Sequence, residues 1–387
     1  MTAGMLMPPV PVIPHEIGSL REEVRAFLRD QRAAGRFIPQ CDSWLVGWDE
    51  SFSRALGERG WIGMTVPERY GGRGRTPLER YAVTEELLAA GAPVAAHWFA
   101  DRQIGPSLLR FGTEPQREYF LPAIARGEFY FAVGMSEPDS GSDLASVRTS
   151  AARQPGGWLL NGTKVWTSGA HRAHAIIALA RTGPVAESDR HAGLSQFIVS
   201  TDAPGLSVRP IRLISGEHHF NEVHFDDVVV PDSMVLGTIG EGWRQVTSEL
   251  AWERSGPERF LSTYPLLSRV LDVIRESGSD RYFQAAGSIL ARLWSLRQMS
   301  MAVAASLAGG VAAEIPAALV KQHGTRFESE IIDLARLVLN VAPDPGATED
   351  KGARLLAQAI LQSPGFTLRG GTNEILQGVV ARGLGLR

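Results

Sequence analysis

The segment richest in candidate ligand-binding groups is residues 134–143, which read GMSEPDSGSD. It follows an apolar, strand-like run at residues 129–133, and its glycines and small hydroxyl residues favour a turn. Successive backbone N–H groups in such a turn can form a concave nest that binds phosphate or another anion. A surface turn that caps the next element is the alternative interpretation, and the residues alone do not separate the two.

Two further segments combine aromatic, hydroxyl and glycine residues. Residues 164–169 read KVWTSG, in which Trp166 lies near two hydroxyl side chains and could stack on a flat ring. By composition alone, a core tryptophan on a strand is the favoured interpretation of that segment. Residues 369–375 read RGGTNEI, where Thr372 with Asn373 could cap the last helix. A helix N-terminus also attracts electron-rich ligand atoms, so a ligand contact is the alternative.

One carboxylate falls within an apolar helical stripe. The stripe of a helix expected to begin at Gly242 consists of Trp243, Val246 and Leu250. Glu253 follows Leu250 by three residues and therefore lies on the same face. Buried carboxylates are rare unless they are paired, so a salt bridge to Arg254 or Arg259 is the favoured interpretation from the residues alone. A catalytic base is the alternative, and the stripe could also end before Pro257.

The elements that must position these segments follow the order helical, β, helical. Residues 17–126 are mostly helical, with apolar residues such as Leu20 and Val24 at helical spacing. Short strand candidates follow residue 129, among them residues 223–225 and 228–230. Asn161-Gly162 predicts a tight hairpin turn between residues 158–160 and 164–166. Helical signals return at Gly242. The pattern predicts an α+β fold with an N-terminal helical domain (1–128), a middle β domain (129–237) and a C-terminal helical bundle (238–387).

Composition excludes several classes of function. The 387 residues are 44% hydrophobic and 21% charged, which is typical of a soluble globular protein of two or three packed units. The net charge of −3 gives no electrostatic reason to expect binding of nucleic acid or an anionic membrane. Residues 1–14 lack the charged start of a signal peptide, and the glycines within the apolar residues 299–320 favour a bundle helix over a membrane span. A cytoplasmic protein is expected.

Other signatures of catalysis are absent from the sequence. No G-x-G-x-x-G follows an expected strand, and no G-x-S-x-G is present. The lone Cys41 excludes an intrachain disulfide and a thiolate metal cluster. His218, His219 and His224 lie in a β segment without an obvious set of carboxylate partners, so exposed or core histidines are expected and no metal site is predicted.

Taken together and in order, these segments resemble the acyl-CoA dehydrogenase family. The likeness extends from about Leu20 to Arg387. Residues 134–143 resemble the flavin-binding signature of that family, residues 161–168 (NGTKVWTS) its second flavin segment, and residues 371–375 (GTNEI) its C-terminal flavin segment. Residues 220–223 and 230–232 match its later β segments.

The resemblance implies the fold and the cofactor. It implies an acyl-CoA dehydrogenase fold whose C-terminal domain is a four-helix bundle, with FAD between that bundle and the middle domain. It also implies a homotetramer, because a neighbouring subunit helps to close the flavin site in this family. The family's Arg-x-x-Phe-Gly segment, which meets the cofactor from that neighbour, has only the loose counterpart Arg281-Tyr282-Phe283-Gln284 here.

The resemblance also implies roles for individual residues. Ser136 and Ser168 would hydrogen-bond the flavin ring, Trp166 would pack against it and Ser142 would meet the pyrophosphate. The implied cofactor contacts are Met135, Ser136, Gly141, Ser142, Trp166, Ser168, Thr372 and Glu374. The implied substrate contacts are Arg254 and Gly370.

The position of the catalytic base departs from the commoner pattern. Many members carry a glutamate in a Tyr-Glu-Gly-Thr run, but here that run reads Arg369-Gly370-Gly371-Thr372. Isovaleryl- and long-chain-type members instead carry Glu-Arg on the first helix of the C-terminal bundle, which matches Glu253-Arg254. The resemblance therefore implies that Glu253 is the base, reversing the preference for a salt bridge.

The implied function is FAD-dependent α,β-dehydrogenation of an acyl thioester carried by CoA or an acyl carrier protein. Glu253 would remove the α-proton while hydride moves to flavin N5, and an electron-transfer flavoprotein, or oxygen in an oxidase, would accept the electrons. The alternatives are a flavin-dependent monooxygenase on the same fold and a non-catalytic subunit of a mixed tetramer. Relatives of the first kind lack the glutamate, which disfavours it.

Overall fold

The chain divides into two compact units. The computed structural model describes residues 6–184, 189–278, 280–311 and 313–386. One unit, called the helical unit below, comprises Met1–Gly47, Thr76–Pro93 and Leu250–Arg387. The other, the sheet unit, comprises Trp48–Arg75 and Val94–Glu249. The division between them after Glu249 falls within one helix, α8 (Gly242–Ser255).

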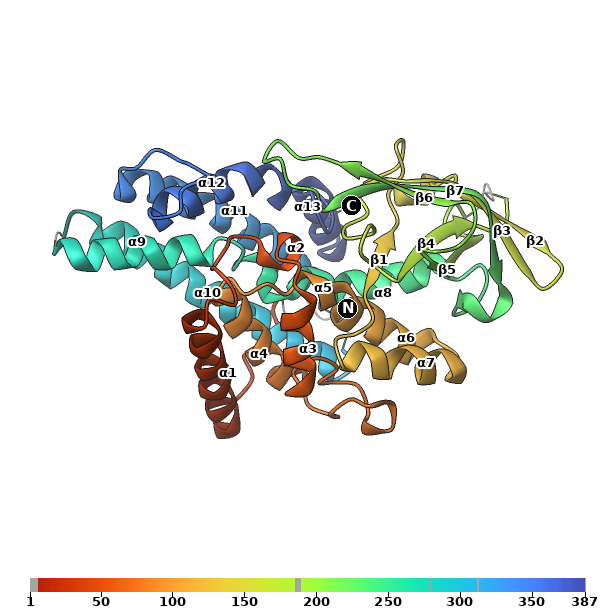
Figure 1. Cartoon of the computed structure of the whole chain (residues 1–387), viewed down its shortest axis with the longest axis horizontal. Helices are drawn as coiled ribbons and strands as arrows, with labels where there is room; N and C mark the ends of the chain where they lie inside the picture. The colour runs from red at the N-terminus through yellow and green to blue at the C-terminus, as the bar shows by residue number, and fades with distance from the viewer. Residues whose placement is uncertain (1–5, 185–188, 279, 312, 387) are drawn as a thin grey trace. The chain divides into compact units, whose positions relative to one another are not determined.

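The helical unit consists mainly of helices, which are labelled in Figure 1. They are α1 (His15–Ala33), α2 (Ser43–Val46), α4 (Pro77–Ala89), α9 (Tyr264–Ser277), α10 (Phe283–Ala308), α11 (Glu314–Leu339), α12 (Lys351–Phe366) and α13 (Asn373–Gly383). Short 3-10 turns at Pro257–Arg259 (η5) and Asp280–Tyr282 (η6) join them. The expected stripes are buried as predicted, for example Leu20 and Val24 on α1. Helical periodicity therefore identified the buried face of these helices.

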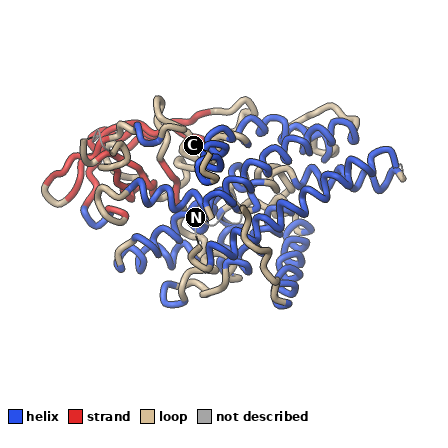
Figure 2. The backbone as a smooth tube through the Cα atoms, turned by 180° about the vertical axis from the view of Figure 1, so that it is seen from behind, coloured by secondary structure: helices blue, strands red, loops and turns tan. Residues whose placement is uncertain are grey.

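The sheet unit combines short helices with a mixed sheet, whose strands are drawn in red in Figure 2. Its helices are α3 (Glu50–Glu58), η1 (Glu68–Tyr70), α5 (Ala95–Phe99), the π-helical turn η2 (Ala100–Ile104), α6 (Gly105–Phe111), α7 (Glu114–Ala125), η3 (Leu144–Ser146) and η4 (Asp232–Met234). Its strands are β1 (Phe131–Gly134), β2 (Ser150–Gln154), β3 (Gly157–Lys164), β4 (Ala175–Arg181), β5 (Leu194–Ser200), β6 (Leu206–Ile211), β7 (Phe220–Pro231) and β8 (Val235–Leu236). The strand order is β6-β7-β3-β2-β4-β5-β8, and β1 pairs with β4 in parallel.

Both faces of the central strand β4 are buried. Ile176 and Ala178 belong to one apolar cluster, and Ala175 and Ile177 belong to another. The second cluster includes Leu108 of α6 and residues of α7, so these helices cover that face of the sheet. A strand buried on both faces reads as a continuous apolar run, as residues 175–180 do.

The hairpin predicted at Asn161-Gly162 is wrong. β3 runs through both residues, and the turn lies between β2 and β3, where Gln154 pairs with Gly157. Pairing with β7 shifts register between Leu160 and Gly162, so the glycine marks a bulge. A Cβ on Gly162 would lie 2.5 Å from Thr149 Oγ1, which explains why this residue is glycine. Strand pairing on both sides of β3 therefore outweighs the local turn preference.

Two other expectations are refined by the structure. The strand candidates at residues 223–225 and 228–230 are parts of one long strand, β7. The apolar residues 299–320 are not a single helix, because α10 ends at Ala308 and α11 begins at Glu314. Among the described residues, no helix has the length and apolarity that crossing a membrane requires.

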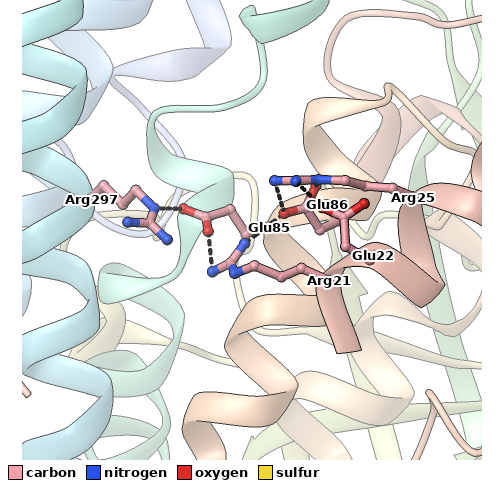
Figure 3. Close-up of polar contacts among 6 residues, drawn as sticks. All are labelled: Arg21, Glu22, Arg25, Glu85, Glu86 and Arg297. Atoms are coloured by element: carbon pink, nitrogen blue, oxygen red, sulfur yellow. Dashed lines mark hydrogen bonds and ion pairs between the residues drawn. The ribbon is translucent and has the colours of Figure 1, made fainter. Parts of the chain in front are cut away.

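A polar network joins three helices of the helical unit (Figure 3). Glu86 of α4 accepts hydrogen bonds from Arg21 Nη1 at 2.7 Å and from Arg25 Nε at 2.8 Å, both on α1. The neighbouring Glu85 accepts from Arg297 Nε of α10 at 2.7 Å. Glu85 and Glu86 are almost fully buried, so their charges depend on these arginines.

Glu86→Gln is expected to lower the free energy of unfolding by about 1–3 kcal/mol, because it weakens several charge-assisted hydrogen bonds at once. Urea denaturation of the two proteins measures the difference. The matched control is Glu22→Gln, since the side chain of Glu22 pairs with Arg25 but is 65% exposed. The control is expected to change stability by no more than about 0.5 kcal/mol, and equal effects of the two substitutions would contradict the assigned importance of burial.

Candidate active site

In the sheet unit, the two predicted flavin segments are held side by side. The first segment leaves the sheet at Gly134, the last residue of β1. The backbone N–H of Val165 donates to the carbonyl of Ser136 at 2.9 Å. Lys164 Nζ donates to the carbonyl of Met135 at 3.1 Å. Residues separated by almost thirty positions in the sequence thus form one continuous site surface.

A buried ion pair links the two predicted flavin segments. Lys164 Nζ lies 2.8 Å from Glu137 Oε1, and the two side chains are 0% and 7% exposed. Glu137 also accepts from the backbone N–H groups of Arg148 and Thr149 at 2.6 and 2.8 Å. Burial opposes ionisation of Glu137, but the charge of Lys164 and these hydrogen bonds outweigh it and lower the pKa of Glu137. For Lys164, burial prevails and lowers the pKa to about 8.

Trp166 is not a core residue, which corrects the interpretation from composition. Its side chain is 53% exposed, and its ring meets Phe220 edge-on at a centroid distance of 5.6 Å. Its backbone has φ of 60°, a left-handed conformation that costs a non-glycine residue about 1–2 kcal/mol. Neighbouring bonds hold it there, because Thr167 donates to the carbonyl of Asn221 at 3.0 Å and Asn221 Nδ2 donates back at 2.9 Å. A locally strained backbone that presents a flat ring is a feature associated with ligand sites.

The remaining residues predicted to contact the cofactor in this unit are accessible. Met135, Ser136 and Ser168 are partly buried, and Gly141 and Ser142 are exposed in the turn that follows β1. Ser140 Oγ donates to the carbonyl of Asp143 at 2.7 Å and stabilises that turn. The structure therefore brings Met135 and Ser136 next to residues 164–165, which directly precede Trp166 in the sequence, and leaves Gly141 and Ser142 exposed.

In the helical unit, Glu253 and Arg254 lie next to Gly370. Arg254 Nε donates to the carbonyl of Gly370 at 3.0 Å. Glu253 Oε1 lies 2.8 Å from Arg259 Nη2, so the salt bridge weighed as an alternative is also present. A Cβ on Gly370 would lie 3.1 Å from Glu253 Oε1 and 3.0 Å from Arg259 Nη2. Glycine at position 370 thus leaves room for a carboxylate that comes from α8.

A buried lysine that the sequence analysis missed holds the turn containing Gly370. Lys321 of α11 is 0% exposed and donates to the carbonyls of Gly371 at 2.6 Å and Thr367 at 3.3 Å. Its ammonium also reaches Asn373 Oδ1 at 3.4 Å. Burial, followed by the charges of Arg259 and Arg369, lowers the pKa of Lys321 to about 7. Periodicity places Lys321 in an alanine-rich helix but gives no signal of its carbonyl partners.

The predicted cap of the last helix is confirmed. Thr372 Oγ1 accepts from the backbone N–H of Ile375 at 3.3 Å, at the N-terminus of α13. Glu374, in the first turn of that helix, is exposed. The hydroxyl of Thr372 therefore has a structural role, and its predicted contact with a cofactor, like that of Glu374, stays a prediction.

A second buried charge cluster anchors the start of the same turn. Arg369 Nη1 donates to Asp42 Oδ2 at 2.6 Å, and Arg369 Nη2 donates to Ser262 Oγ at 3.3 Å. Glu328 Oε1 accepts from the backbone N–H of Ser262 at 2.8 Å. Glu328 is 0% exposed, and burial raises its pKa to about 7. These residues lie far apart in the sequence, so no local pattern could have grouped them.

The lone cysteine and the histidines considered as candidates lie among other side chains of the fold. Cys41 is buried, and burial raises the pKa of its thiol, as expected of an inert cysteine. His218 stacks on His171 at a centroid distance of 4.0 Å, and its Nε2 lies 2.8 Å from Asn221 Oδ1. Within the part of the chain that the structure describes, no group of His, Cys, Asp and Glu is arranged to hold a metal ion.

Comparison with known proteins identifies the family. The family model described as "Acyl-CoA dehydrogenase, N-terminal domain" matches residues 14–128, and "Acyl-CoA dehydrogenase, middle domain" matches residues 132–228. The chain is 34% identical to the acyl-CoA dehydrogenase IpdE1 of Mycobacterium tuberculosis over 96% of its own length and 98% of that relative. The chain therefore belongs to the acyl-CoA dehydrogenase family, whose members are FAD-dependent oxidoreductases.

Individual relatives add detail. The acyl-CoA dehydrogenase FadE34 of Mycobacterium tuberculosis is 35% identical over 95% of this chain, but the match covers 49% of FadE34, so the chain spans about half its length. A solved structure titled "Tcur3481-Tcur3483 steroid ACAD" is 31% identical with a TM-score of 0.82 and covers 97% of this chain and 98% of its own. The ChsE4-ChsE5 complex from Mycobacterium tuberculosis is 27% identical with a TM-score of 0.80, covering 97% of this chain and 98% of its own. The predicted α+β fold, with helical N- and C-terminal parts around a mixed sheet, is confirmed; the boundaries at residues 128 and 237 stay a prediction.

Glu137→Gln is expected to lower the free energy of unfolding at pH 7 by about 3–5 kcal/mol, because it leaves the buried ammonium of Lys164 without a counter-charge. The difference from the parent is expected to shrink as pH rises past 8, where the pKa of Lys164 makes the lysine neutral in the parent as well. Urea denaturation at pH 7 and pH 9 measures both effects. Asp139→Asn in the same turn, where the carboxylate is 78% exposed, is the matched control and is expected to be nearly neutral.

Glu328→Gln is expected to stabilise the protein at pH 8. A carboxyl whose pKa is raised on folding makes stability fall as pH rises from its unfolded value of 4.5 to its folded value of about 7. The full pKa shift of Glu328, at 1.36 kcal/mol per pKa unit, corresponds to a loss of stability of roughly 3 kcal/mol. An uncharged glutamine avoids this loss. Urea denaturation from pH 4 to pH 8 should show the gain vanishing at the acid end. Asp333→Asn, on the same helix and 75% exposed, should show no such dependence.

Proposed function

We propose that this chain is an FAD-dependent dehydrogenase that introduces an α,β double bond into an acyl thioester, with Glu253 as the base. The observation that carries the proposal is the convergence of Glu253 with Gly370. The carboxylate oxygen of Glu253 lies 3.1 Å from the point where a Cβ would stand at Gly370. Members of the family carry their base at one of these two positions. In this chain the carboxylate of Glu253 occupies the space that the lack of a side chain at Gly370 leaves open.

The residues of the sheet unit suit a flavin. Trp166 presents an exposed ring for stacking, and Ser136 and Ser168 offer hydroxyls for the edge of a heteroaromatic ring. The exposed turn at Gly141 and Ser142 offers backbone N–H groups to a pyrophosphate. When bound, FAD supplies the hydride acceptor of the reaction. Thr372 and Glu374 are proposed as further cofactor contacts.

Glu253 takes the α-proton in this proposal. The α-proton of a thioester is weakly acidic, so its removal needs a carboxylate fixed within hydrogen-bonding reach of the reacting carbon. Arg254 fixes the backbone of Gly370 by donating to its carbonyl, and both residues are proposed to contact the substrate. The side chain of Glu253 is 22% exposed, so a substrate that covers it would exclude water from the carboxylate.

The substrate class and the electron acceptor are part of the proposal. Because a 31% identical structure is titled a steroid ACAD, thioesters with a bulky polycyclic acyl group belong in the substrate panel beside straight and branched acyl-CoAs. Acyl groups carried by an acyl carrier protein are tested separately. An electron-transfer flavoprotein is proposed as the acceptor of the electrons.

A mixed assembly is a second candidate to the homotetramer. Two solved relatives carry paired names, Tcur3481-Tcur3483 and ChsE4-ChsE5. The segment expected to reach a neighbouring flavin also departs from the family pattern, and its Tyr282 hydroxyl instead donates to the carbonyl of Leu337 at 3.0 Å. Light scattering and the FAD content of the chain purified alone distinguish the two. One FAD per chain in a tetramer supports the homotetramer, and a flavin-poor chain that gains FAD with a co-expressed partner supports the mixed assembly.

Glu253→Gln is expected to retain flavin and lose turnover by a factor of about 10²–10⁴, because only the proton acceptor is removed. The flavin absorbance spectrum measures retention, and reduction of an artificial electron acceptor with the best thioester of the panel measures turnover. Glu276→Gln, an exposed acid on α9, is the control and should match the parent. A Glu253→Gln protein whose turnover lies within twofold of the parent would sink the assignment.

Moving the carboxylate tests the convergence directly. The double variant Glu253→Ala with Gly370→Glu is expected to recover part of the turnover that Glu253→Ala alone loses, since position 370 projects toward the same point and alanine frees the space that the Glu253 carboxylate fills. Recovery should be incomplete because Gly370 has φ of +70°, which strains any L side chain by about 1–2 kcal/mol.

A further inference from the structure

Arg259 donates two hydrogen bonds to Glu253, one to its backbone and one to its side chain. Its Nε donates to the backbone carbonyl of Glu253 at 2.9 Å, and its Nη2 donates to the carboxylate Oε1 at 2.8 Å. One planar guanidinium therefore fixes both the helix end and the side chain of the same residue. The side chain of Arg259 is 1% exposed, so water screens this contact poorly.

We propose that Arg259 is a positioning residue that holds the Glu253 carboxylate beside Gly370. This inference rests on the proposed role of Glu253 as the base. The ion pair and the role of Glu253 as the base are then compatible interpretations, because the ion pair holds the carboxylate in place for proton transfer. Since the ion pair uses Oε1, the proton taken from the substrate goes to Oε2.

The fold holds Arg259 itself in place. It lies in η5, the short turn that follows Gly256. A Cβ on Gly324 of α11 would lie 2.3 Å from the carbonyl oxygen of Arg259, so glycine there allows α11 to pack directly against this backbone. The guanidinium lies over the ring of Trp44 at 5.3 Å, which favours a cation at this position. Contacts from α11 and α2 thus help to define one orientation of Arg259.

The other charges around Glu253 are already committed to different partners. Arg254, its neighbour on α8, donates to the carbonyl of Gly370. Lys321 of α11 donates to backbone carbonyls, and its pKa of about 7 leaves it only partly charged at neutral pH. Arg369 is paired with Asp42. Of these cations, Arg259 makes the direct contact with the carboxylate, so its removal is expected to act on Glu253 most strongly.

Acidic groups nearby complete the electrostatic picture. Glu328 of α11 and Asp42 lie around Arg369 and Ser262, and Glu258 is buried in η5 beside Gly256. Glu314, at the start of α11, interacts with Arg254. Loss of Arg259 would therefore remove the one direct contact among these charges that fixes the orientation of the Glu253 carboxylate.

The test follows the environment of the Glu253 carboxylate without relying on turnover. In protein labelled with ¹³C at the glutamate carboxyl carbon, the Glu253 resonance is identified by its loss in Glu253→Gln. We expect Arg259→Gln to shift and broaden that resonance at neutral pH, because the carboxylate loses the contact that fixes its orientation. Arg259→Lys keeps the charge without the two-point contact and should give a smaller change. Arg275→Gln, an exposed arginine on α9, should leave the resonance unchanged.

The kcat for the best acyl-CoA of the panel, measured with the artificial acceptor, gives the functional readout. We expect Arg259→Gln to lower kcat by about tenfold or more with a smaller change in KM, because a misplaced base slows proton transfer, and we expect Arg259→Lys to restore part of it. An unchanged resonance in a folded Arg259→Gln protein, judged by circular dichroism, would overturn the inference. A changed resonance with an unchanged kcat would support the ion-pair role of Arg259 and count instead against Glu253 as the base.

Discussion

The candidate chemistry depends on one close approach, that of a carboxylate from α8 to a glycine turn before α13. Any side chain at position 370 would compete with Glu253 Oε1 for the same space, since its Cβ would lie 3.1 Å away. The glycine, the direction of α8 and the guanidinium of Arg259 therefore form one constraint. Each of these three features is needed for the Glu253 carboxylate to lie within reach of the substrate.

Much of this arrangement could be predicted because it is local. Apolar spacing identified the buried face of α1, and Gly242 was correctly expected to begin α8. Thr372 was expected to cap α13 because a hydroxyl before a helix satisfies free N–H groups. Glu253 and Gly370 were linked only through resemblance to a family, since the two residues are separated by more than one hundred positions.

What could not be predicted depends on contacts distant in sequence. Asn161-Gly162 has the composition of a hairpin turn, but pairing of β3 with both β2 and β7 carries the strand straight through it. Trp166 has the composition of a core residue, but the bonds that fix its two neighbours hold it exposed in a left-handed conformation. In both cases tertiary hydrogen bonds outweigh a local preference of about 1–2 kcal/mol.

In each of the two units a buried lysine anchors a glycine-rich turn. Glycine-rich turns contribute few side chains to a core, so apolar packing alone cannot fix them. Lys164 and Lys321 are both fully buried, and each donates to a backbone carbonyl of such a turn, that of Met135 in one unit and that of Gly371 in the other. Lys164 has Glu137 as a counter-charge, whereas Lys321 donates to neutral oxygens. The turn of the sheet unit is therefore held by an ion pair as well as by a hydrogen bond to its backbone, and the turn beside Glu253 is held through hydrogen bonds to its backbone carbonyls.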